Sequence, residues 1–148
     1  MQALQNRDLL SSDTKAMDQL HDFLRQRREA HEPVENLDAF EQELHRLFVT
    51  AEREALSQEL SRFDLDVPVV EVDGERYHRV LRCETTYSSA VGPVRVERSL
   101  YRSSQGGPTL CPLELRTGII EGAWTPLAAQ AGHLGRSAFD AQRGGRTF

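Results

Sequence analysis

The sequence is poor in the residues that build disulfide frameworks and metal sites. It holds two cysteines, Cys83 and Cys111, with no CxxC motif, and its five histidines include no pair at i,i+4 spacing. Disulfide scaffolds and metal sites need several such residues at converging positions. We therefore expect reduced thiols, a cytoplasmic location and no bound metal. Cys111 lies in the apolar stretch LCPLEL, which is typical of a buried structural cysteine rather than a nucleophile.

Long apolar runs and nucleotide-binding motifs are also missing. No uncharged run approaches the length of a membrane-spanning helix, and the opening residues, MQALQNRDLLSSD, lack the basic and then apolar order of a signal peptide. The glycine-rich motif GxGxxG, the Walker A motif and the GxSxG motif do not occur. We therefore expect no membrane partner, no cofactor and no small-molecule ligand.

Charge is divided unevenly along the chain. Residues 1–73 carry 8 Lys+Arg against 17 Asp+Glu, a formal charge of −9, whereas residues 74–148 carry 10 against 6, a formal charge of +4. A basic half can contact phosphates or an acidic partner. The alternative is that the two halves neutralise each other within one fold.

A first helix is predicted near the start of the chain. Ser12 or Asp13 can cap it, and it should end near Ala30, because Pro33 in the following segment HEPVEN lacks an N–H and disfavours helix. Apolar residues at helical spacing give it one apolar face: Met17, Leu20, Phe23 and Leu24.

A longer second helix is predicted over residues 37–63, with Asn36 as its cap. Its apolar residues recur every three or four positions, which is the period of an amphipathic helix. They are Leu37, Phe40, Leu44, Leu47, Phe48, Ala51, Ala55, Leu56 and Leu60. This face can pack on the rest of the chain, which we favour, or pair with a partner helix.

Two β-hairpins are predicted after the second helix. The first, VPVVEVDGERYHRVLR, turns at Asp73-Gly74, a dipeptide typical of tight hairpins. The second has strands ETTYSS and PVRVERSLYR, with Gly92-Pro93 as its turn. The segment TLCPLELRTGIIEG is interpreted as a short strand and turn, and Thr125-Pro126 as the start of a short C-terminal helix. This order of elements predicts an α+β fold.

Four stretches between Phe40 and Ala129 resemble the N-terminal part of ISKra-type bacterial insertion-sequence transposases. They are AEREAL (51–56), VPVVEVDGERYHRVLR (67–82), TYSSAVGPVRVERSLYR (86–102) and LCPLELRTGIIEGAWTPLAA (110–129). The resemblance implies a DDE-type enzyme whose catalytic domain, RNase H-like with three metal-binding acidic residues, lies downstream. No residue here matches that acidic triad. The resemblance thus implies a non-catalytic region that engages transposon DNA or assembles the transposase.

The arginine-rich hairpins are the candidate DNA-binding elements. Residues 75–102 hold six arginines against three glutamates, with tyrosines between them. Arginines on a sheet can contact phosphates. We expect DNA contact, or self-association, through Arg79, Arg82, Arg95 and Arg98. The alternative is a solvated sheet face on which arginines and glutamates pair across strands.

The end of the sequence departs from the family. There, W-T-P-L-A-A is followed by Arg-Gln-Ala and a helical run, whereas here a glycine-rich tail begins at Gln130. With allowed codons, deleting one base near codon 130 restores Ala-Arg-Gln-Ala and an amphipathic helix. We therefore interpret residues 1–12 as a flexible N-terminus, residues 13–129 as the transposase-like α+β region and residues 130–148 as a disordered, out-of-frame tail. A natural, in-frame tail is the alternative.

Two other functional interpretations remain open. The chain can be a stand-alone helix-and-hairpin module that binds a protein partner through its long helix. It can also be a remnant of a mobile element with no selected function.

Overall fold

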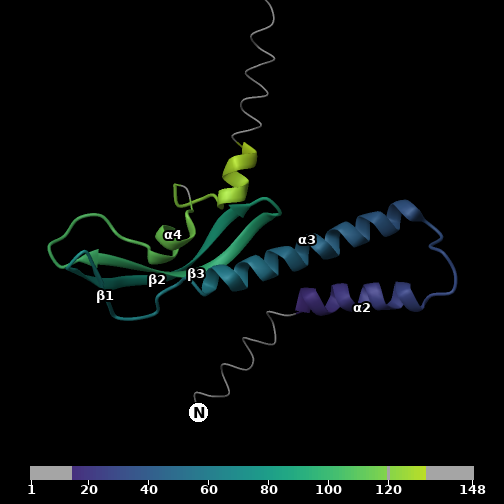
Figure 1. The fold of residues 1–148 in the computed structure, drawn as a ribbon, viewed down its shortest axis with the longest axis horizontal. Helices are drawn as coiled ribbons and strands as arrows, with labels where there is room; N and C mark the ends of the chain where they lie inside the picture. Colours follow the sequence, from purple (N-terminus) through teal and green to yellow (C-terminus); the bar gives the residue numbers. More distant parts are fainter. Residues whose placement is uncertain (1–14, 120, 133–148) are drawn as a thin grey trace, which may run out of the picture. The chain divides into compact units, whose positions relative to one another are not determined.

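The computed structural model describes residues 15–119 and 121–132. The chain forms two compact units, divided between Gln58 and Glu59, and each is described by itself (Figure 1). The first holds helices and the second an antiparallel sheet with a short helix, so the predicted α+β class is confirmed. The predicted flexible residues 1–12, the predicted cap at Ser12 or Asp13 and the predicted tail beyond residue 132 lie outside the described residues.

A pair of helices makes up the first unit. α2 (Lys15–Glu29) and α3 (Leu37–Ser61) are joined by residues 30–36, and the last turn of α3 belongs to the second unit. Asn36 caps α3 as predicted, because its Oδ1 accepts a hydrogen bond from the Ala39 N–H at 3.1 Å. α3 begins at the predicted residue and ends slightly before the predicted end.

The two helices run antiparallel, side by side (Figure 1). Near the connecting loop, the rings of Phe23 and Phe40 stack with their centroids 5.7 Å apart. At the other end, the Met17 N–H donates a hydrogen bond to the Glu54 carboxylate at 3.0 Å. Only part of the predicted apolar stripes meets: Phe23 stacks on Phe40, whereas Met17, Leu24 and Leu37 stay exposed, and α2 itself buries no residue.

The second unit is built on a three-stranded antiparallel sheet. β1 (Val69–Val72), β2 (Glu75–Ser89) and β3 (Gly92–Ser103) lie in the order β1-β2-β3. Asp73 and Gly74 form the predicted first turn, with φ angles of 50° and 78°. Both angles are positive, as the tightest hairpin turn requires. The two predicted hairpins share one continuous central strand, β2.

The second turn lies earlier than predicted. Ser89 pairs with Gly92, so Ala90 and Val91 form the turn, and Pro93 already belongs to β3. The Ser89 hydroxyl accepts a hydrogen bond from the Val91 N–H at 3.2 Å and donates one to the Gly92 carbonyl at 2.6 Å. This local hydrogen bonding fixes the turn before the Gly-Pro pair, with Gly92 at a φ of 105°.

β3 buries opposite faces at its two ends. Val94 and Val96 are buried near its start, whereas Ser99, Tyr101 and Ser103 are buried near its end. Successive residues of a strand point to opposite faces, so these two groups lie on different sides of the sheet. Different segments therefore cover the two halves of the sheet, and each half leaves one face towards solvent.

A β-bulge accompanies this change of face. The register between β2 and β3 shifts between Arg79 and Leu81, so β2 has one extra residue there. Bulges bend the bulged strand and increase its twist. Leu81 pairs with Leu100 just past the shift, and Leu81 is 51% exposed. Val94, Val96 and Leu100 alternate onto one face of β3, but only Val94 and Val96, near the turn, are buried.

The segment after β3 forms a helix where a strand and turn were predicted. Leu110 exchanges two backbone hydrogen bonds with Tyr101, at 2.8 and 2.7 Å, but no strand follows. The chain instead enters α4 (Pro112–Thr117), where the proline fits the first helical position. Gly118 ends α4 in the left-handed conformation, with a φ of 73°.

The chain then returns to the sheet and starts a helix. Ser88 donates a hydrogen bond to the Ala123 carbonyl at 2.8 Å and accepts one from the Thr125 N–H at 3.0 Å. Residues 126–132 are helical, so the predicted start at Thr125-Pro126 is confirmed. Residues 130–132, predicted to belong to a disordered tail, continue this helix instead. Within the described ranges, no helix has the length and apolar character needed to cross a membrane.

The first turn offers a test of the fold. Replacing Gly74 with alanine forces a side chain into a φ of 78°, and we expect the free energy of unfolding to fall by about 1 kcal/mol. Urea denaturation measures the change. Gly132→Ala is the control, because Gly132 has no positive φ and no atom near its Cβ position. An equal effect of both substitutions would contradict the turn.

Candidate functional site

All four predicted DNA-binding arginines lie beside carboxylates. Arg79 forms an ion pair with Asp66. Arg82 lies among three carboxylates, with guanidinium nitrogens 3.6 Å from Asp64, 3.8 Å from Asp66 and 3.0 Å from Glu97. These charges are therefore largely satisfied within the second unit.

The other two predicted arginines are also paired. Arg95 lies 3.8 Å from Glu84 and stays largely in solvent, with 78% of its side chain exposed. Arg98 forms an ion pair with Glu114 of α4, and their side chains are only 21% and 19% exposed. Pairs such as Arg82–Glu97 and Arg95–Glu84 match the alternative that arginines and glutamates pair across strands.

The segment between α3 and β1 supplies the most buried carboxylate among these pairs. The Asp64 side chain is 5% exposed and accepts hydrogen bonds from the Ser99 N–H at 2.8 Å and the Ser99 hydroxyl at 3.2 Å. The Tyr101 hydroxyl holds the same segment, since it bonds the carbonyl oxygens of Leu65 and Val67, the latter at 2.7 Å. A buried carboxylate needs such partners, because burial without them is costly.

A second cluster joins the sheet to α4. Tyr87, which is fully buried, donates a hydrogen bond to the Glu114 carboxylate at 2.9 Å. Burial raises the pKa of the Tyr87 hydroxyl, and the Glu114 carboxylate raises it further. Burial alone would lower the pKa of Arg98, but Glu114, Tyr87 and Cys111 together outweigh it and the pKa rises. Burial also raises the pKa of the Cys111 thiol, so this cysteine is a poor nucleophile.

These pairs leave the second unit without a basic surplus. Between residue 59 and residue 132, leaving out residue 120, the sequence has eight arginines, no lysine and ten carboxylates, a formal charge of −2. The positive charge predicted for residues 74–148 depended partly on dividing the chain at residue 73, because residues 59–73 carry −4, and partly on residues 133–148, which carry +2 and lie outside the described residues. Asp64 and Asp66 lie before that division but fold against the arginines.

One part of the sheet differs from the rest. On the side opposite Tyr101, near the β1 end, strand pairing brings together residues that share one face. We call this the open sheet face: Val69, Glu71, Arg76, His78, Leu81, Leu100 and Arg102. His78 is the central member, because it pairs with Val69 on β1 and with Arg102 on β3.

The open sheet face combines two exposed arginines and a histidine with apolar side chains and one exposed carboxylate, Glu71. Arg76, His78 and Arg102 are exposed, as are Val69 (41%) and Leu81 (51%). In the part of the chain that the structure describes, neither arginine has an ion pair. Glu71 is opposite Arg76 in the β1–β2 register, and no ion pair joins the two. These arginines are therefore better placed to contact an anion than the four predicted ones.

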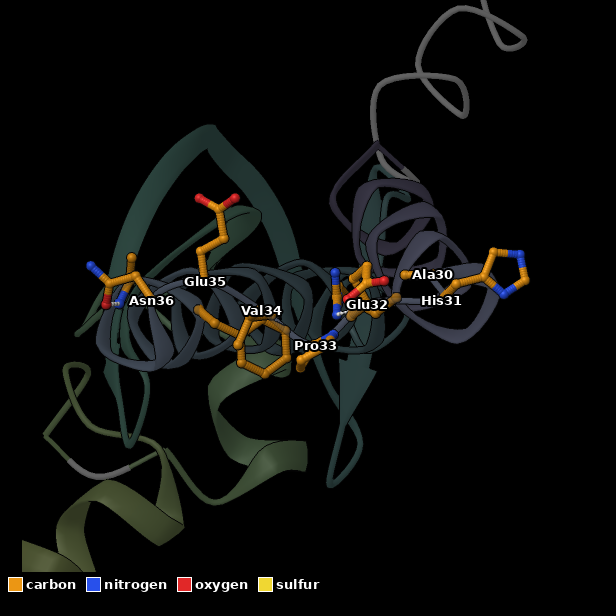
Figure 2. Close-up of a pocket in the computed structure, with 10 residues that line it drawn as sticks. Ala30, His31, Glu32, Pro33, Val34, Glu35 and Asn36 are labelled. Atoms are coloured by element: carbon orange, nitrogen blue, oxygen red, sulfur yellow. Dashed lines mark hydrogen bonds between the residues drawn. The ribbon is translucent and has the colours of Figure 1, made fainter.

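A separate depression lies at the loop of the helical unit (Figure 2). It has a volume of about 680 Å³ and is lined by Arg27, Ala39, Phe40 and residues 30–36. Figure 2 shows Glu35 and His31 directed away from each other. Arg27 already donates to the Glu32 carbonyl at 3.1 Å. A ligand site needs polar groups that converge on one point, and this depression has none.

Comparison with known proteins adds no family. No family model, no curated protein and no solved structure matches the chain. Among the described residues there is no group of three or more histidine, cysteine or acidic side chains that could hold a metal ion. Cys83 and Cys111 are both free thiols.

The sequence indicates arginines on the sheet but does not single out Arg76 and Arg102. The signal that separates them is register. Arg102 is opposite His78 rather than an acid, whereas Arg82 lies within reach of Asp64 and Glu97. Register follows from the positions of the turns and of the bulge, and the bulge near Val80 has no distinctive motif in the sequence.

The buried carboxylate leads to a stability prediction. Asp64→Ala removes two hydrogen bonds from Ser99, leaves the Ser99 N–H without a partner and removes one carboxylate beside Arg82. We therefore expect the free energy of unfolding to fall by about 2 kcal/mol. Asp66→Ala is the control. Because the Asp66 side chain is 59% exposed, we expect its removal to lower the free energy of unfolding by well under about 1 kcal/mol. Urea denaturation compares the two. Equal losses would contradict the special position of Asp64.

The two cysteines should differ in reactivity. Cys111 is buried with a raised pKa, whereas Cys83 is half-buried on β2. We expect iodoacetamide to modify Cys83 first and Cys111 only when the chain is unfolded in urea. Peptide mass spectrometry on samples quenched at intervals reports both rates. Early labelling of Cys111 in the native chain would show that the α4 region opens readily.

Proposed function

We propose that this chain corresponds to the non-catalytic N-terminal part of an insertion-sequence transposase, and that it contributes to transposition by contacting DNA through the open sheet face. The family part of this proposal rests on the resemblance of residues 40–129 to ISKra-type transposases. The structural support is one observation: Arg76, His78 and Arg102 share an exposed face on which neither arginine has an ion pair among the described residues.

Physical magnitudes limit what such a contact can do. Two arginines neutralise about two phosphates, which gives a slope of about −2 for the logarithm of affinity against the logarithm of salt concentration. Contacts to phosphates position a protein on DNA but do not read its sequence. The formal charge of −2 on the described second unit also opposes strong binding. The open sheet face therefore suits a supporting contact within a larger transposition complex.

Protein–protein assembly is the second candidate. It is favoured by large apolar side chains that the helical unit leaves exposed, among them Leu37 (62%) and Phe48 (49%). In a transposase this surface would assemble the complex, and in a stand-alone module it would bind a partner. The two candidates involve different units of the chain and can be tested separately.

The DNA contact predicts which arginines matter. With a fluorescent duplex at low salt, we expect the Arg76→Ala/Arg102→Ala variant to lose most of the binding measured by anisotropy, and its salt slope to approach zero. The control is Arg62→Ala/Arg95→Ala, which makes the same charge change at residues paired with Glu59 and Glu84. Equal losses in the two variants would show that only net charge matters, and would contradict the proposal.

A further inference from the structure

The helical unit leaves part of its apolar surface uncovered. Along the seam between the helices, Leu47 and Ala51 are each 4% exposed. Beside the seam, Met17 (48%), Leu24 (37%), and the α3 residues Leu37 and Phe48 remain exposed. Two helices alone rarely bury enough apolar surface to be stable, so a face of this kind needs a cover.

The exposed residues lie on one side of the helix pair. Met17 and Leu24 are seven positions apart on α2, and Leu37, the half-buried Leu44 and Phe48 follow spacings of seven and four on α3. Such spacings keep residues on one helix face. Around the axis of each helix, this group is rotated from the seam by roughly a quarter of a turn, in the direction of increasing residue number on both helices. Because the helices are antiparallel and both right-handed, the two groups point to the same side.

We call this surface the hairpin face: Met17, Leu24, Leu37, Leu44 and Phe48. Its two edges carry opposite charges. On the side of the hairpin face away from the seam, α2 carries His21, Arg25 and Arg28. On the same side of α3 lie Glu41, His45 and Glu52. Arg25 makes an exposed ion pair with Asp22 at 3.2 Å, and no ion pair of Arg28 or Glu41 is found among the described residues.

Opposite charges on the two edges make the hairpin face complementary to itself. A two-fold axis parallel to the helices would place α2 of one copy over α3 of the other, with the connecting loops at the same end. The basic edge of each copy would then meet the acidic edge of its partner, twice. Arg28 and Glu41 both lie near the loop end of their helices, so they would be at similar heights.

We propose that the hairpin face docks on the hairpin face of a second copy of this chain, forming a four-helix bundle in which α2 packs over α3 of the partner. Four-helix bundles bury such apolar faces in a shared core. This inference deepens the assembly candidate and is independent of the DNA contact, which uses the other unit. Failure of the dimer would therefore leave the proposed DNA contact untouched.

Sedimentation velocity of the full chain over a wide range of concentrations tests the dimer. We expect a concentration-dependent dimer that is lost in Phe48→Glu. Leu115→Glu is the matched control, because Leu115 is 66% exposed on α4 and should leave the dimer intact. Circular dichroism checks that each variant keeps its helix content. A monomer at every concentration, or a dimer that survives Phe48→Glu, would overturn the proposal.

A charge swap tests the orientation. Arg28→Glu and Glu41→Arg each place like charges at both symmetric contacts, and we expect each to weaken the dimer about fivefold. The double variant restores opposite charges and should regain the original dissociation constant. If the single variants weaken the dimer and the double variant does not recover, α2 does not lie over α3 of the partner, and the proposed packing is wrong.

Discussion

The Asp64 carboxylate lies almost fully buried against β3, where it accepts hydrogen bonds from both the N–H and the hydroxyl of Ser99. Its position fixes the segment between α3 and β1 on one face of the sheet, and the Tyr101 hydroxyl holds the same segment two residues further on. Asp66, carried by this segment, pairs with Arg79, and Asp64 itself reaches Arg82. The buried Asp64 carboxylate thus holds the segment that covers this face of the sheet and that brings carboxylates to Arg79 and Arg82.

The charge pattern of the folded unit follows from this arrangement. One face of the sheet is covered near β1 by the segment 64–67, and the other is covered near the second turn by α4 through Glu114. Each cover brings carboxylates to arginines. What remains is the open sheet face, where Arg76 and Arg102 lie beside His78. Within the described residues, a sheet with many arginines therefore offers only a small cationic surface, and we expect any DNA contact through it to be weak.

Local features of the fold could be predicted from the sequence because they depend on neighbouring residues. Asn36 caps α3, Asp73-Gly74 makes a tight turn, and Thr125-Pro126 starts a helix, each through chemistry within a few residues. Three features could not be predicted. The bulge between Arg79 and Leu81, the helix at Pro112 and the pairing of arginines with Asp64 and Asp66 all depend on contacts between distant segments. The candidate site changed for the same reason, since register decides which arginines meet a carboxylate.

The sheet arginines divide into paired and unpaired groups, and arginine modification measures this division directly, without any binding partner. Phenylglyoxal treatment of the native chain, followed by peptide mass spectrometry, gives a rate for each arginine. The structure predicts that Arg76 and Arg102 react quickly, while Arg82 and Arg98 react slowly until the chain is unfolded. Similar rates for all four arginines in the native chain would contradict the account.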